Sequence, residues 1–92
     1  MKTVQEITDI ANARIDAGLF DDLDTEQKKT DYVNDQIISE MKSFLVSTDW
    51  IVVKISEALI KGQDTAALLT KYDEDLTNRA SARAAINSVS GG

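Results

Sequence analysis

The stretch Ser47-Thr48-Asp49-Trp50-Ile51-Val52-Val53-Lys54 holds the chain's one tryptophan and bears most directly on the fold. Hydroxyl and carboxylate side chains accept hydrogen bonds from the free backbone N–H groups of a first helical turn. A carboxylate there also meets the positive end of the helix dipole. The stretch therefore predicts a helix that begins near Asp49, with Trp50 as a core aromatic at the join between two helices.

The β-branched run Ile51-Val52-Val53 would also suit a strand. Lys54 and Glu57 lie one helical turn apart and favour a helix, which we expect to end near Lys61 with Gly62 as its stop. Apolar residues cover more than one face of this segment. We therefore expect it to be largely buried, either inside the domain or against a partner.

Two more helices are predicted before this segment. The first covers about residues 4–17, because Thr3 and Glu6 have capping-box spacing and Gly18 can close the helix. The second covers about residues 25–46, with Asp24 as its cap. Its apolar stripe recurs at helical spacing and comprises Tyr32, Val33, Ile37, Met41, Phe44 and Leu45.

The last predicted helix covers about residues 65–89 and is capped by Asp64. At 1.5 Å per residue it would be roughly 37 Å long, so we expect one end to project from a domain of this size. A break near Thr77-Asn78 is an alternative. Its apolar side is expected to carry Leu69, Tyr72, Leu76, Ala80 and Ile86, with Arg83 on the same side.

These segments predict a single all-α domain over residues 1–92, with four helices at about 4–17, 25–46, 49–61 and 65–89 in a small bundle. The chain has no proline and only four glycines, and it lacks the Asn-Gly dipeptide typical of β-hairpins.

The composition argues against several kinds of chemistry. The chain has no cysteine and no histidine, which removes thiolate chemistry and the commonest general base and transition-metal ligand. No catalytic spacing of the remaining ionisable residues is visible. We expect no enzymatic activity, metal, cofactor or small-molecule substrate. No apolar run is long enough for a membrane span, so a soluble product made inside a cell is expected.

The net charge of −6 comes from 16 acidic and 10 basic residues, and no cluster of lysine and arginine is present. Direct binding of nucleic acid, which needs such a cluster, is not expected. The acidity suits solubility. It also suits a second hypothesis, in which the chain mimics nucleic acid and inhibits a host defence protein by blocking its basic groove.

The acidic segment Asp21-Asp22-Leu23-Asp24-Thr25-Glu26 has the alternation of a calcium-binding loop. An EF-hand that began at Asp22 would need glycine at its sixth position and glutamate at its twelfth. This chain has Gln27 and Val33 there. We therefore expect a solvated helix cap.

Arg79 and Arg83 are four residues apart and are expected to share one face of the last helix. One interpretation is a solvated basic end that favours the helix dipole. The other is a pair of anchors for carboxylates on a neighbouring chain.

The opening Ser47-Thr48-Asp49-Trp50-Ile51-Val52-Val53-Lys54 resembles the (S/T)-(S/T)-D-W-x-hydrophobic-x-(R/K) start of a small helical module in tailed-bacteriophage proteins, the tail and tail-fibre assembly proteins. The later helix, with Tyr72, Leu76 and Arg79-Ala80-Ser81-Ala82-Arg83-Ala84-Ala85-Ile86, is similar to the module's last helix. The resemblance covers residues 44–89. Residues 1–43 form an unassigned helical hairpin, and the connector Gly62-Gln63-Asp64-Thr65 lacks the module's usual proline.

The resemblance implies a non-enzymatic phage protein that acts by contact with other phage structural proteins or by self-association. It would be made in the cytoplasm of a host bacterium, and would be either a virion component or a transient assembly chaperone. Burial of an apolar helix face would drive binding, with Trp50, Ile51, Val53 and Tyr72 as anchors. Arg79 and Arg83 would then set the orientation.

Overall fold

The computed structural model describes residues 1–20 and 22–90, and within them the regular secondary structure is all α-helix. It contains α1 (Val4–Asp16), α2 (Glu26–Ile60), α3 (Ala66–Lys71) and α4 (Asp73–Ser90). Asp21 of the acidic segment, and Gly91 and Gly92 at the end, lie outside the described residues. The predicted all-α class is confirmed.

The first helix forms as its sequence predicts. The Thr3 side chain accepts a hydrogen bond from the Glu6 backbone N–H at 3.1 Å, and the Glu6 carboxylate accepts one from the Thr3 N–H at 3.4 Å. Gly18 follows the helix with φ of +73°, a conformation that costs a residue with a Cβ atom about 1 kcal/mol or more.

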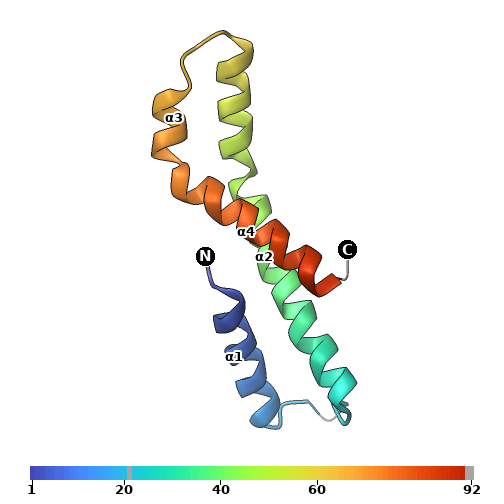
Figure 1. Cartoon of the computed structure of the whole chain (residues 1–92). Coiled ribbons are helices and arrows are strands. Elements are labelled where there is room, and N and C mark those ends of the chain that lie inside the picture. Colours follow the sequence, from blue (N-terminus) through green and yellow to red (C-terminus); the bar gives the residue numbers. More distant parts are fainter. Residues whose placement is uncertain (21, 91–92) are drawn as a thin grey trace.

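The predicted division between residues 46 and 49 is wrong, because one helix, α2, runs through it for 35 residues. Ser47 and Thr48 donate their hydroxyls to the Phe44 carbonyl, at 2.9 and 2.8 Å. These hydroxyls therefore bond backwards to the preceding turn and do not cap a new one. Figure 1 shows α2 changing direction near this point, where α4 crosses it.

Other predicted helix boundaries also moved. Thr25, rather than Asp24, caps α2, because its side chain accepts from the Lys28 N–H at 3.2 Å. Gly62 ends the helix at φ +73°, as predicted. The predicted 65–89 helix is interrupted at Tyr72, and not near Thr77-Asn78, which gives the short α3 and the longer α4. Thr65, rather than Asp64, is the N-cap residue of α3, and its side chain makes no capping hydrogen bond. The Asp64 side chain, one residue earlier, accepts from the Ala66 N–H at 2.9 Å.

The helix that outruns its neighbours is α2 and not the last one. At 1.5 Å per residue its 35 residues extend about 52 Å, and the whole molecule measures 57 × 23 × 15 Å. In Figure 1 α1 lies along the lower half of α2, α4 crosses its middle, and α3 stands beside its upper half. The molecule is therefore one long helix with short helices on its sides.

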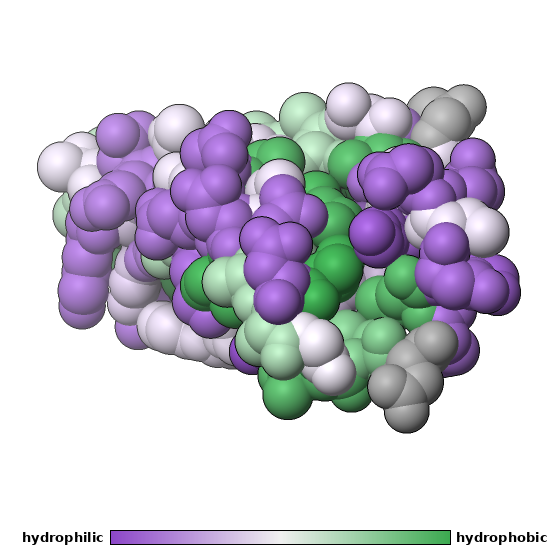
Figure 2. Space-filling model, turned by 90° about the horizontal axis from the view of Figure 1, so that it is seen from below, coloured by the Kyte–Doolittle hydropathy of each residue, from purple (hydrophilic) through white to green (hydrophobic). Residues whose placement is uncertain are grey.

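Two apolar clusters hold the helices together. The lower one joins three helices through Ile7 of α1, Ile37 and Met41 of α2, and Ala82 of α4. The upper one contains Ile51, Ile55 and Tyr72. Both are small. Figure 2, which shows the molecule from below, has hydrophobic surface as a band between hydrophilic regions.

Candidate functional site

A polar layer separates the two apolar clusters at the crossing of α2 and α4. The Arg79 side chain is 10% exposed, and one of its terminal nitrogens, Nη1, donates to the Leu45 carbonyl at 2.7 Å and to Thr48 Oγ1 at 2.7 Å. The other, Nη2, donates to Asp49 Oδ1 at 2.9 Å. The guanidinium thus joins α4 to α2 by three charge-assisted hydrogen bonds.

At the predicted break α2 continues, and the side chains expected to cap a new helix make other contacts. Asp49 does not meet a helix N-terminus, since its carboxylate accepts from Arg79 instead. The Leu45 carbonyl receives the guanidinium as an additional donor. A side chain that bonds to the carbonyls of a helix in this way is a recognised cause of helix bending.

The arginine pair is divided by the structure. Arg79 is buried, whereas Arg83, one turn further along α4, is exposed. No ion pair joins Arg83 to a carboxylate within residues 1–20 and 22–90. The predicted apolar side of the last helix is therefore right for Tyr72, Leu76 and Ile86, which pack in the two clusters, and wrong for the exposed Leu69, Ala80 and Arg83. Ala82, Ile86 and Val89 face the core, and Ala80 is exposed.

Trp50 is the largest correction among the candidate residues, because it is 54% exposed and not a core aromatic. Its ring meets the buried Tyr72 edge to face, with the centroids 5.5 Å apart and the planes at 86°. The ammonium groups of Lys71 and Lys54 lie 5.4 and 6.0 Å from the centroid of the Tyr72 ring. Trp50 is thus held on one side by an aromatic contact and open on the other.

The remaining candidates fall on opposite sides of α2. Ile51 is fully buried and contributes to the upper cluster, so it cannot contact a partner. Val53 is 54% exposed. Of the six candidates, the structure leaves Trp50, Val53 and Arg83 accessible and places Ile51, Tyr72 and Arg79 inside the fold.

Two further residues belong with Trp50 and Val53. Val46 is 72% exposed and Ile60 is 85% exposed. The four residues follow at spacings of four, three and seven, so they lie on one side of α2, turned away from Ile51 and Ile55. We call Val46, Trp50, Val53 and Ile60 the outer stripe. Sequence reasoning missed its continuity, because the predicted break placed Val46 on a different helix.

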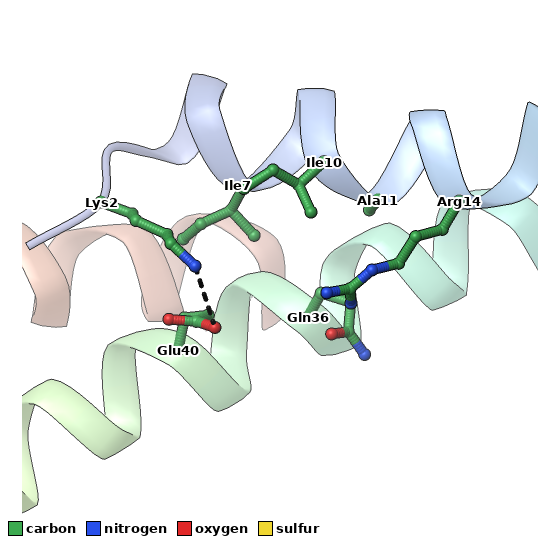
Figure 3. A pocket seen from close by; sticks show the side chains of 7 residues that line it. All are labelled: Lys2, Ile7, Ile10, Ala11, Arg14, Gln36 and Glu40. Atoms are coloured by element: carbon green, nitrogen blue, oxygen red, sulfur yellow. Dashed lines mark ion pairs between the residues drawn. The ribbon is translucent and has the colours of Figure 1, made fainter.

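The hollows of the molecule are shallow. Figure 3 shows one between α1 and α2, where Lys2 reaches Glu40 and the Arg14 side chain extends toward Gln36. Its volume of about 20 Å³ holds about one water molecule. A wider, open hollow between the same helices is lined mainly by polar residues such as Thr8, Asn12 and Lys29.

Surface charges are dispersed and partly paired. Lys28 contacts Asp24 at 2.8 Å, and Lys29 contacts Glu26 at 3.5 Å. In the part of the chain that the structure describes, acidic side chains do not gather into a group of three that could hold a metal ion. These pairings favour a solvated surface over one continuous acidic face.

None of the helices described is both long enough and apolar enough to cross a membrane.

Comparison with protein-family models, with curated proteins and with solved structures finds no match to this chain.

Proposed function

We propose that the chain is a non-enzymatic bacteriophage protein that acts by protein–protein contact in the structure or assembly of the tail or tail fibre. The phage context rests on the resemblance of residues 44–89 to the tail-assembly module. The mode of action rests on the molecule itself. A helical protein with shallow hollows and a row of exposed apolar side chains is suited to binding other polypeptides.

The outer stripe is the single observation that carries the proposal. Isolated apolar residues on a surface are ordinary, but these four share one helix face and form a row that only Glu57 interrupts, between Val53 and Ile60. The row extends about 21 Å from Val46 to Ile60 at helical rise. It includes a tryptophan, the residue type most enriched among the dominant contacts of interfaces.

The shape of the molecule also favours binding. Its radius of gyration is 17.3 Å, whereas a compact domain of 92 residues has about 12 Å. A thin rod buries little of its own surface, and partners that pack along it supply the burial it lacks.

The proposal is tested in particles of the phage that encodes the chain. We expect quantitative mass spectrometry to find the protein in purified virions, or in tail intermediates if it is a transient chaperone. Val53→Glu should lower its recovery there by tenfold or more. The matched control is Leu19→Glu, which places the same charge on an exposed leucine outside the outer stripe. Absence of the protein from both virions and intermediates would contradict the proposal.

A further inference from the structure

We propose that the outer stripe is a self-association surface, which pairs with the outer stripe of a second copy in antiparallel orientation. The inference rests on the proposed function in one respect, namely that the chain acts by apolar contact. It goes further in naming a second copy of the chain as the partner that binds the outer stripe.

The amount of exposed surface fits one missing partner. The molecule has 6165 Å² of accessible surface, whereas a folded monomer of its mass, 10.1 kDa, has about 5,300 Å². The excess is roughly 900 Å². Each partner in a stable interface of standard size buries about 800 Å². The surplus, summed over the whole elongated molecule, is therefore similar in size to the area that one such contact removes.

The spacing of the stripe is that of a helix pair. Val46, Trp50, Val53 and Ile60 occupy the two core positions of successive heptads, and Glu57 occupies the remaining one. Before Val46 the corresponding positions are polar, at Ser39 and Ser43. The contact would thus be limited to about two heptads of α2, in the half where only the short α3 and the start of α4 cover its other side.

Charge and size select the antiparallel orientation. In a parallel pair the same position meets itself, so Glu57 would face Glu57 and Trp50 would face Trp50. Two like carboxylates at a buried contact are destabilising. In an antiparallel pair the two core positions alternate across the contact, and Trp50 of each copy can face Val53 of the other.

The flanking residues agree with this register. With Trp50 opposite Val53, Asp49 lies near Ser56 of the second copy, and Lys54 lies near Ser47. Shifting the pair by one heptad in one direction would bring Lys54 close to Lys54. Shifting it in the other direction would bring Asp49 close to Asp49. The register we propose therefore places no like charges of the two copies against each other.

The first test measures mass in solution. We expect sedimentation equilibrium of the full chain to show a monomer–dimer equilibrium at micromolar concentration, and Val53→Glu to weaken it at least 100-fold. Leu19→Glu, the matched control, should leave it unchanged. Circular dichroism of both variants checks that each keeps its helices. A folded wild-type chain that stays monomeric at several hundred micromolar would overturn the proposal, as would a dimer that Val53→Glu leaves intact.

The second test measures orientation, and the absence of cysteine from the natural chain makes it direct. An oxidised mixture of Ser47→Cys and Lys54→Cys chains should form mixed disulfides. Glu57→Cys alone should not cross-link, because the two introduced thiols would lie about 16 Å apart along the helices. Efficient cross-linking of Glu57→Cys would show a parallel pair and overturn the register.

The two proposals can fail separately. A chain that is monomeric alone, yet is recovered from virions in a manner that depends on Val53, binds a different phage protein. That outcome would overturn self-association and support the proposed function. A dimer that is absent from virions and tail intermediates would support self-association and overturn the proposed function.

Discussion

At the scale of single residues, Arg79 and Arg83 show how much the setting of a side chain matters. We expect Arg79→Ala to lower the free energy of unfolding by about 2–4 kcal/mol, since it removes charged hydrogen bonds to the Leu45 carbonyl and Thr48. Much of the Asp49 side chain is exposed, at 61%, so that partner contributes the least. Urea denaturation measures the loss.

Arg83→Ala is the matched control for this prediction, because it removes the same side chain one turn away on the exposed side of α4. It should change the free energy of unfolding by less than about 0.5 kcal/mol. Arg79→Lys should recover only part of the stability, because an ammonium cannot present the planar fork of donors. Equal effects of Arg79→Ala and Arg83→Ala would show that the polar layer does not form.

Trp50 and Ile51 are neighbours in sequence with opposite surroundings. A buried tryptophan would cost about 3–5 kcal/mol on truncation. Because Trp50 is half exposed, we expect Trp50→Ala to cost only about 1–2 kcal/mol, from its contact with Tyr72 and its partial burial. Ile51→Ala should cost about 2–4 kcal/mol. Thermal and urea unfolding of the monomeric chain measure the two losses of unfolding free energy. A larger loss for Trp50→Ala than for Ile51→Ala would contradict the half-exposed position of Trp50.

At the scale of elements, the continuity of α2 is directly measurable. If a helix began at Asp49, the N–H groups of its first turn would lack intrahelical acceptors. In one helix from Glu26 to Ile60 they bond to the preceding turn. We expect the amides of residues 49–52 to be protected in hydrogen exchange by NMR to the same degree as those of residues 42–45. Rapid exchange confined to residues 49–52 would show that the division predicted from sequence is present after all.

The helices differ in how far their sequences predict them. The capping residues of α1 and its glycine stop have one sterically favoured arrangement, and the structure has it. Two arrangements are open to Ser47, Thr48 and Asp49. Their side-chain oxygens can accept hydrogen bonds from the following turn of helix, or the two hydroxyls can donate to the preceding turn. In the structure Thr48 and Asp49 both accept from Arg79, some 30 residues away in the chain. A tertiary contact of this kind is invisible to local pattern.

The same two possible arrangements of residues 47–49 limit how well the sequence predicts the candidate site. The sequence predicts Trp50 and Val53 as contact residues from their type, and the structure leaves both accessible. Val46 and Ile60 are not predicted, because the heptad spacing appears only when residues 46–60 are read as one helix. Ile51 and Tyr72 were named for their apolar character, which predicts burial as readily as binding. Sequence therefore predicted the class of surface but not which side of α2 carries it.

At the scale of the whole molecule, the two halves differ in how their helices are packed together. The lower cluster joins three helices, whereas the upper one joins α2 to α3 and the start of α4. Regions with few buried apolar contacts open locally at lower free energy than the rest of a protein. We therefore expect the backbone amides of residues 53–60 and 68–71 to exchange at least tenfold faster than those of residues 37–45 when the chain is dilute and monomeric.

Self-association should change this difference in exchange rate between the two halves. A second copy that binds only the native state raises the free energy of local opening where it binds. As the protein concentration rises, exchange of residues 46–60 should slow, while that of α1 should not. Val53→Glu should abolish the concentration dependence of the exchange rates and keep the difference between the two halves. Uniform protection along the dilute chain would show that the upper half needs no partner, and protection that rises equally in α1 would place the contact elsewhere.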